Sequence, residues 1–129
     1  MGKSILIIDD DRDFRNSLKH VLECNDYKVY EAGNGKEGIE SYRRINTDLV
    51  ITDIYMPEKD GLETIKELRK EFPEARIIAI SGGYKDSGNF LHIARTFGAI
   101  DCIRKPFKPD DLIRIVNLTL DGNASAGAV

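Results

Sequence analysis

Five residues able to do chemistry stand at the ends of short apolar runs in this sequence: Asp9, Asp10, Asp53, Ser81 and Lys105. Runs of this kind, rich in β-branched residues, are typical of strands buried on both faces. An unpaired ionised aspartate is costly to bury, so we expect each acid to lie where its strand emerges from the core. In a parallel sheet all five residues would then meet at one edge, where ligands of open α/β sheets bind.

Three carboxylates at one edge would repel one another at neutral pH, because the pKa of a free aspartate is about 3.9. A divalent cation relieves this repulsion, and Mg²⁺ commonly binds a few carboxylates, several waters and phosphate oxygens. The Lys105 ammonium and the Ser81 hydroxyl suit the remaining oxygens of a phosphoryl group. A carboxylate can itself be the nucleophile in group transfer. The five residues therefore predict a site for a phosphoryl group and Mg²⁺.

The elements that must position these residues alternate along the chain. Short apolar runs predict five strands, near residues 5–8, 27–31, 49–53, 76–80 and 100–104. Apolar residues at helical spacing predict five helices, near residues 12–24, 35–45, 62–72, 90–97 and 109–120. Such alternation indicates a parallel sheet covered by helices on both faces. We expect an α/β fold, a three-layer doubly wound (βα)5 of the flavodoxin-like kind with strand order 2-1-3-4-5.

The composition is that of one globular domain. Of 129 residues, 41% are hydrophobic and 32% charged, and the net charge of -3 argues against direct nucleic-acid binding. No apolar run approaches the roughly 20 residues of a membrane-spanning helix. The run at 5–8 is too short for a signal peptide, so we expect a cytoplasmic protein without a membrane partner. We assign residues 1–120 to the domain and expect the small, polar residues 121–129 to form a disordered tail.

Each candidate residue has a simpler interpretation when it is taken alone. Asp9 or Asp10 could be the N-cap of the helix that follows. Ser81 precedes two glycines and could be a turn residue, and a lone lysine such as Lys105 is usually a solvated charge. Only the convergence of these residues on one sheet edge favours a phosphoacceptor site.

Other reactive residues are assigned no chemistry. We expect Asp11 to be an exposed acid in the first turn of its helix. His20 and His92 lie in helical stretches without the spacing of metal ligands. Cys24 and Cys102 lie far apart without a CxxC motif, so we expect two reduced, partly buried thiols.

The order and spacing of these motifs resemble the receiver domain of two-component response regulators, over about residues 3–120. The motifs that carry this resemblance are Asp9-Asp10, Asp53, Ser81 and Lys105-Pro106-Phe107. Further stretches are similar to signatures of that family: Ala32-x-Asn34-Gly35, Met56-Pro57, Asp60-Gly61 and Gly98-Ala99. Any one motif is weak, whereas the complete set in order is specific. The chain is similar to stand-alone receivers of the chemotaxis-regulator type.

The resemblance implies that Asp53 is phosphorylated by a histidine kinase or a histidine phosphotransfer protein. Asp10, Asp53 and the backbone carbonyl of Tyr55 would bind Mg²⁺ directly, or Mn²⁺ in its place, and Asp9 would act through water. A domain of this kind is not an enzyme in the ordinary sense, because it catalyses only its own phosphorylation and dephosphorylation. We expect a monomer or a weak dimer.

At the phosphoryl group, the resemblance implies that Ser81 binds an oxygen and that Lys105 pairs with it. The surface around the fourth helix, fifth strand and fifth helix would then change and control an unidentified downstream protein. One position departs from the family pattern: the switch position, usually Tyr or Phe, holds Cys102. Because a thiol is too small to sweep the same volume, we expect coupling to run through the backbone of residues 81–84, which include Gly82 and Gly83.

Two alternatives of other classes remain. A phosphohydrolase of the haloacid dehalogenase type would use a DxD motif, which Asp9-x-Asp11 fits superficially. Against it, the chain is short, a second acidic pair near the end is missing, and Arg12-Asp13 replaces the usual Gly-Thr or Gly-Ser. Phosphorylation at Asp53 rather than Asp9 would separate the two. The second alternative is a phosphorylation-independent interaction module, whose usual sign, loss of an acid or of the lysine, is not seen.

Overall fold

The computed structural model describes residues 2–54, 61–81 and 90–121. These ranges contain five strands, β1 (Ser4–Ile8), β2 (Lys28–Ala32), β3 (Leu49–Asp53), β4 (Ile77–Ser81) and β5 (Asp101–Arg104). They also contain five helices, α1 (Arg12–Glu23), α2 (Gly35–Ile45), α3 (Gly61–Glu71), α4 (Phe90–Phe97) and α5 (Pro109–Leu120). All strand pairs are parallel and the order is β2-β1-β3-β4-β5, which confirms the predicted flavodoxin-like fold. None of these helices has both the length and the apolarity required to cross a membrane.

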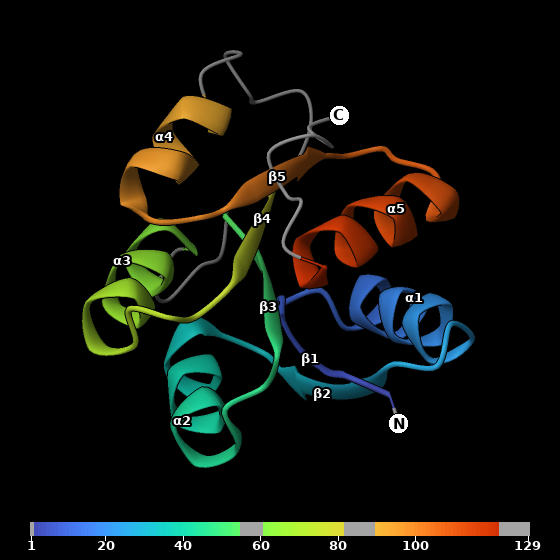
Figure 1. Ribbon diagram of the computed structural model, residues 1–129, viewed down its shortest axis with the longest axis horizontal. Coiled ribbons are helices and arrows are strands. Elements are labelled where there is room, and N and C mark those ends of the chain that lie inside the picture. Colours follow the sequence, from blue (N-terminus) through green and yellow to red (C-terminus); the bar gives the residue numbers. More distant parts are fainter. Residues whose placement is uncertain (1, 55–60, 82–89, 122–129) are drawn as a thin grey trace.

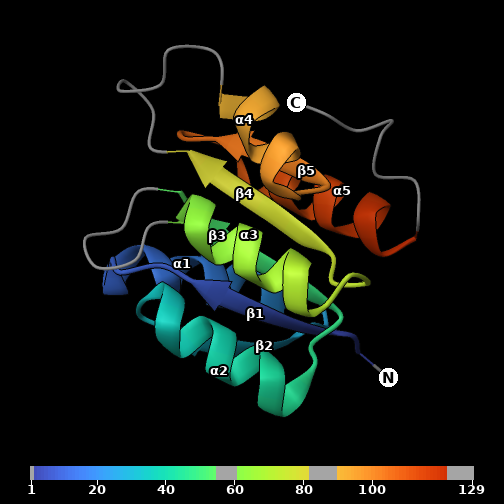
Figure 2. The ribbon, with the colours of Figure 1, turned by 90° about the vertical axis from the view of Figure 1, so that its left-hand side faces the viewer.

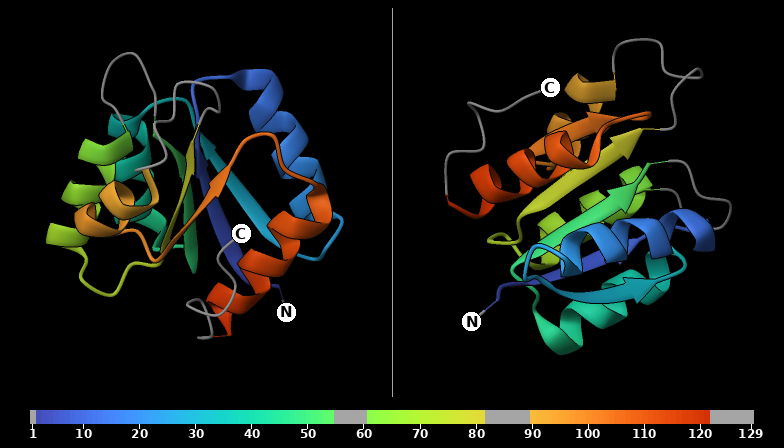
Figure 3. Two further views of the ribbon diagram at one scale, coloured as in Figure 1. Left: turned by 90° about the horizontal axis from the view of Figure 1, so that it is seen from above. Right: turned by 90° about the vertical axis from the view of Figure 1, so that its right-hand side faces the viewer.

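The sheet lies between two layers of helices (Figure 1; Figure 3, left). Helices α1 and α5 cover one face, and α2, α3 and α4 cover the other. Successive strand residues point to opposite faces, so Ile5 and Ile7 of β1 pack with α1 and α5, whereas Leu6 and Ile8 pack toward α2 and α3. Burial on both faces explains why the central strands β1, β3 and β4 are almost continuously apolar.

The strand register brings the ends of β1 and β3 side by side. Ile8 pairs with Thr52, so the residues that follow them, Asp9 and Asp53, are neighbours across the sheet. Because the sheet is parallel, the carboxyl ends of the strands lie on one edge, which faces left in Figure 2. The topology therefore brings the strand-end residues into one region, as the sequence predicted.

Two of the helices begin with side-chain caps. Asn34 caps α2 by accepting a hydrogen bond from the Glu37 N–H. The expectation for Asp11 was wrong in part: it is exposed, but it is the N-cap of α1 rather than a residue of its first turn. Its carboxylate accepts hydrogen bonds from the N–H groups of Asp13 and Phe14. The chain leaves β1 in an extended conformation for long enough that the third acid, not the first or second, meets the helix N-terminus.

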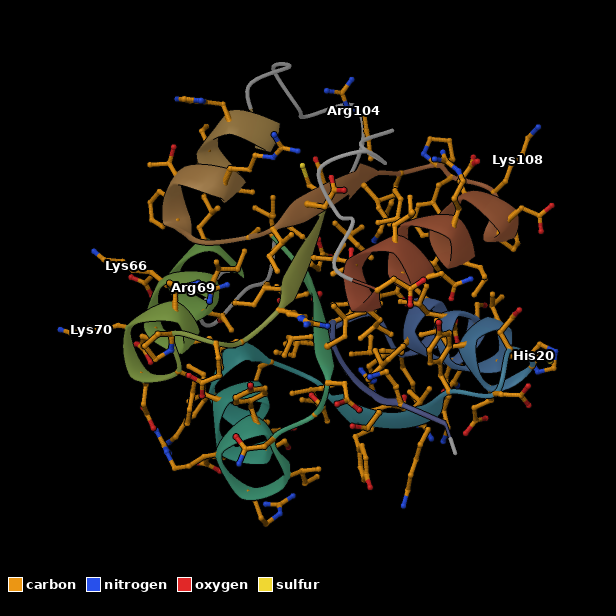
Figure 4. All side chains as sticks on the ribbon, in the orientation of Figure 1. His20, Lys66, Arg69, Lys70, Arg104 and Lys108 are labelled. Atoms are coloured by element: carbon orange, nitrogen blue, oxygen red, sulfur yellow. The ribbon has the colours of Figure 1, made fainter. Side chains whose placement is uncertain are left out.

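The two cysteines lie in different environments. Both are free, and Cys102 is buried. Cys24, which we expected to be partly buried, is exposed because it is the C-cap of α1 and has left the apolar face of the helix. His20 and His92 are exposed, and Figure 4 shows His20 pointing outward at the periphery of the molecule.

Candidate functional site

Three carboxylates meet at the carboxyl edge of the sheet. Asp9, Asp10 and Asp53 each offer an oxygen atom, and these atoms all lie within 4.8 Å of one another. Asp9 and Asp10 directly follow β1, and Asp53 is the last residue of β3. Asp9 and Asp53 are buried, whereas Asp10 is exposed. The predicted convergence of three acids is confirmed.

Asp9 lies in a cluster whose three carboxylates are only partly compensated by the ammonium beside them, that of Lys105. The pKa of the Asp9 carboxyl is raised to about 6, mainly by burial and also by the charges of Asp53 and Asp10. A hydrogen bond from the Asp11 N–H to Asp9 Oδ1, at 2.8 Å, and the charge of Lys105 both lower the pKa. A divalent cation with oxygen ligands would offset the remaining charge, so the donor set fits Mg²⁺.

Lys105 brings one positive charge to two of the acids. Its Nζ lies 3.8 Å from Asp9 Oδ2 and 3.7 Å from Asp53 Oδ2. The same ammonium lies 3.8 Å from the ring centroid of Phe14, a cation–π contact. The backbone holds Lys105 beside β4, because its N–H donates to the Ser81 carbonyl at 3.0 Å. The lysine that follows β5 therefore reaches across β4 and β3 to the acids.

Ser81 places a hydroxyl at the end of the neighbouring strand. The residue is fully buried, and its Oγ has no hydrogen-bond partner among the described residues. Buried hydroxyl groups in proteins are nearly always hydrogen-bonded, so an exception calls for an explanation. Because Ile80 pairs with Asp53, Ser81 lies next to the end of β3. Its hydroxyl is free to bond an oxygen of a ligand held at Asp53.

The start of α3 packs directly against the end of β3. The Gly61 N–H donates to the Ile54 carbonyl at 2.7 Å. A Cβ atom at Gly61 would lie 1.9 Å from the Asp53 carbonyl oxygen, which no side chain could tolerate. The Asp60-Gly61 signature thus has a physical reason at its glycine: the helix approaches the backbone of Asp53 too closely for any other residue.

The profile of the family described as "Response regulator receiver domain" matches residues 5–117. The chain belongs to this family. Two curated relatives are similar over almost the whole receiver. This chain is 39% identical over 118 residues to the chemotaxis protein CheY of Thermotoga maritima. The alignment covers 91% of this chain and 97% of that protein. It is also 38% identical over 122 residues to CheY of Bacillus subtilis, in an alignment that covers 94% of this chain and 100% of that protein.

The fold comparison agrees with the sequence comparison. A crystal structure of a CheY-like receiver domain protein from Methanospirillum hungatei has a TM-score of 0.87 to this receiver and is 31% identical. The match covers 98% of this chain and 100% of that one. The chain is therefore a phosphoacceptor domain of two-component signalling and not a conventional enzyme. Its acidic triad is typical of the Mg²⁺ site of receivers.

The haloacid dehalogenase alternative does not fit this receiver. Its DxD motif would require the carboxylates of Asp9 and Asp11 to serve one site. Asp11 instead caps α1 through two backbone N–H groups. The described acids that cluster are Asp9, Asp10 and Asp53, which is the receiver arrangement.

Some of the predicted site residues lie outside the described ranges. These are Tyr55, whose carbonyl was expected to bind the cation, and Gly82 and Gly83, expected to carry the coupling. Cys102, which the family resemblance assigns to the switch position, is described. It is buried in the core cluster that includes Ala79 and Ala94, where the thiol packs as a small hydrophobe.

Two residues of α1 contact the site although the sequence did not single them out. The Phe14 ring lies against the Lys105 ammonium, and the Arg15 Nη1 donates to the Asp9 main-chain carbonyl at 2.7 Å. In the sequence, Phe14 is one more apolar position of an amphipathic helix, and Arg15 is indistinguishable from a solvated helical charge. The only available signal was that both lie within five residues of Asp10.

Proposed function

We propose that Asp53 of this receiver domain accepts a phosphoryl group from a histidine kinase or a histidine phosphotransfer protein. The arrangement around Asp53 supports this most directly. Its carboxylate ends the central strand, with the acids of β1 on one side and the partnerless Ser81 hydroxyl on the other.

In the proposed transfer, a carboxylate oxygen of Asp53 attacks the phosphorus of a phosphohistidine. A P–O bond forms as the P–N bond to the imidazole breaks, and the released nitrogen keeps the electron pair and takes a proton from solvent. Ser81 donates its hydroxyl to one phosphoryl oxygen, and Lys105 pairs with another. Hydrolysis of the acyl phosphate by water restores the Asp53 carboxylate.

The proposal includes a Mg²⁺ ion, held by Asp10 and Asp53, by the Tyr55 carbonyl, and by Asp9 through water. When bound, the ion supplies positive charge that offsets the carboxylates and the phosphoryl oxygens. Mn²⁺, which also prefers carboxylate and water ligands, would replace it. The cluster itself supports this part of the proposal, since ligand oxygens of three carboxylates lie within 4.8 Å of one another.

The output of the proposed phosphorylation is a change on the surface of α4, β5 and α5 that controls an unidentified downstream protein. Ser81 ends β4 and Lys105 directly follows β5, so a phosphoryl group that draws these two residues would act on the backbone next to α4 and α5. We further propose that the receiver works in the cytoplasm as a monomer or weak dimer. Residues 1–120 would suffice for this function.

Phosphorylation with radiolabelled acetyl phosphate tests the proposal. The protein should be labelled in the presence of Mg²⁺ and not in excess EDTA, and Asp53→Asn should abolish the label. Asp11→Asn is the matched control: it changes an exposed acid to a residue that also caps helices, so labelling should be retained. Full labelling of Asp53→Asn, or label mapped to Asp9, would contradict the proposal. Absence of label in the wild-type protein with every phosphodonor would favour the phosphorylation-independent module.

A further inference from the structure

Arg15 connects α1 to the ends of β1 and β2 beside the acidic site. Its Nη1 donates to the main-chain carbonyl of Asp9 at 2.7 Å, and its Nε donates to Glu31 Oε1 at 3.1 Å. Only 17% of the Arg15 side chain is exposed. A guanidinium withdrawn from water requires partners for its N–H groups, so these two bonds define where the side chain lies. Neither bond has a part in the proposed phosphoryl transfer.

The carbonyl that Arg15 binds belongs to the peptide between Asp9 and Asp10. The ladder of β1 with β2 and β3 ends at Ile8. Beyond it, the Asp9 N–H still donates to the Ala32 carbonyl at 3.1 Å. Among the described residues, Arg15 is the one donor to the Asp9 carbonyl. Arg15 is therefore the side chain through which α1 restrains this peptide plane, which the hydrogen bond from the Asp11 N–H to Asp9 Oδ1 restrains from the other side.

The orientation of that peptide matters because of Asp10. The Asp10 side chain is exposed, and no hydrogen bond or ion pair holds its carboxylate within the described part of the chain. Its direction toward the other two acids is thus set by the backbone that carries it. A rotation of the Asp9–Asp10 peptide would swing this oxygen away from the cluster, in which all three ligand atoms lie within 4.8 Å.

We propose that Arg15 is a positioning residue of the metal site. By holding the Asp9 carbonyl it fixes the peptide that aims the Asp10 carboxylate at the cation. Glu31 in turn fixes Arg15, so the penultimate residue of β2 is coupled to the site. Arg15 itself touches neither the cation nor the phosphoryl group. The inference rests on the proposed function, because it assumes that Mg²⁺ binds at Asp9, Asp10 and Asp53.

Mg²⁺ titration of the metal-free protein, without a phosphodonor, tests this role. Binding is followed through amide NMR shifts of Asp10 and Asp53, and thermal unfolding without Mg²⁺ monitors the fold. Arg15→Met keeps much of the side-chain length and removes both donors. Its Kd for Mg²⁺ should rise about tenfold, the low end of the effect of outer residues that orient metal ligands. Arg15→Lys, which retains one charged donor, should recover part of this loss.

Glu31→Gln provides a second route to the same conclusion. It weakens the anchor of Arg15 without touching Asp9, so it should raise the Kd for Mg²⁺ by less than Arg15→Met does. The double variant should bind Mg²⁺ no more weakly than Arg15→Met alone, because Glu31 acts through Arg15. If Arg15→Met does not fold, the Glu31→Gln variant decides: an unchanged Kd overturns the inference.

Lys19→Met is the matched control. Lys19 also pairs with Glu31, at 3.4 Å, but it makes no contact with Asp9. This variant should bind Mg²⁺ within about twofold of the wild type, as expected for a partly exposed ion pair. An unchanged Kd in Arg15→Met, or an equal loss in Lys19→Met, overturns the positioning role and leaves the proposed function intact. A wild-type protein that binds no Mg²⁺ overturns the metal site and this inference together.

Discussion

Asp9 and Asp10 are identical side chains at adjacent positions, yet their environments differ. The Asp9 N–H continues the bonding of β1 to β2 through the Ala32 carbonyl, and the residue is only 2% exposed. Asp10 has left the strand and is exposed. The sequence could place both acids at a strand end, because an apolar run stops there. It could not say which of them is buried, because that depends on where the last strand hydrogen bond forms.

Removal of the Lys105 side chain tests whether phosphorylation of Asp53 can occur without the conformational response to it. Lys105→Ala deletes the cation beside Asp9 and Asp53 but leaves the proposed nucleophile and metal ligands in place. Labelling by acetyl phosphate should persist at a reduced level. The amide NMR shifts that phosphorylation produces in α4 and β5 should be largely lost, because the variant has no ammonium group that can pair with the phosphoryl group.

The control for Lys105→Ala is Lys108→Ala. Lys108 is an exposed lysine at the N-cap of α5, makes no side-chain cap bond, and points outward at the periphery of the molecule (Figure 4). It should leave both labelling and the induced shifts unchanged. Wild-type shifts in phosphorylated Lys105→Ala would show that the lysine does not transmit the signal.

At the scale of elements, the sequence predicts what local patterning determines. All five strands and five helices of the described ranges were anticipated, with ends that differ by a residue at most. The sequence predicted β4 over residues 76–80, whereas the strand runs one residue later, from Ile77 to Ser81. It includes Ser81 because β5 still offers a partner there: Ser81 pairs with Arg104. The contacts of Phe14 and Arg15 with the site were not predictable, because they depend on how α1 packs over the strand ends.

The junction of β3 and α3 yields a prediction about an element boundary. Gly61→Ala would place a Cβ 1.9 Å from the Asp53 carbonyl oxygen and 2.6 Å from the Ile54 Cα. Both are backbone atoms and cannot move aside as a flexible side chain would. We expect the free energy of unfolding, measured by urea denaturation, to fall by about 2 kcal/mol or more, as for other overpacked positions.

Gly33→Ala is the corresponding control. A Cβ at Gly33 would make only ordinary contacts, 3.8 Å from Arg15 Nη1 and from Glu37 Oε1. Its free energy of unfolding should stay within about 1 kcal/mol of the wild type, since an alanine that fits also lowers the entropy of the unfolded chain. Equal stability of the two variants would contradict the close approach of α3 to Asp53. Phosphorylation of Gly61→Ala should be impaired as well, because the displaced backbone carries the nucleophile.

At the scale of the whole molecule, the two apolar clusters on either face of the sheet stabilise a site that is itself unfavourable. The three central strands are almost wholly buried, and their buried polar residues Thr52, Asp53 and Ser81 lie at the carboxyl ends, whereas Asp101 is buried at the start of β5. Burial raises the pKa of Asp9 to about 6, well above its ordinary 3.8. Burial also raises the pKa of Asp101, whose Oδ2 is buried without a hydrogen bond in the described structure. Both acids therefore bind protons more tightly in the folded protein than in the unfolded chain.

This difference in proton binding predicts how stability depends on pH in the absence of Mg²⁺. Between pH 3.8 and about 6 the folded protein holds more protons at Asp9 than the unfolded chain, so the free energy of unfolding falls as the pH rises through this window. Above it, the full penalty of an ionised Asp9 remains. Because a tenfold change in proton affinity corresponds to about 1.4 kcal/mol, this penalty is about 3 kcal/mol at most. In EDTA, the protein should be less stable at pH 7.5 than at pH 5.

Asp9→Asn removes the titrating group and keeps an oxygen that can accept from the Asp11 N–H. In EDTA it should raise the free energy of unfolding at pH 7.5 by up to about 3 kcal/mol, raise it about half as much at pH 5, and flatten the profile between them. Mg²⁺ should stabilise the wild-type protein more at pH 7.5 than at pH 5, because it binds the ionised acids, and should stabilise Asp9→Asn less. Asp11→Asn, which changes an exposed capping acid by the same substitution, should follow the wild-type profile. A profile of Asp9→Asn that parallels the wild type would show that the charge of Asp9 is not what destabilises the site.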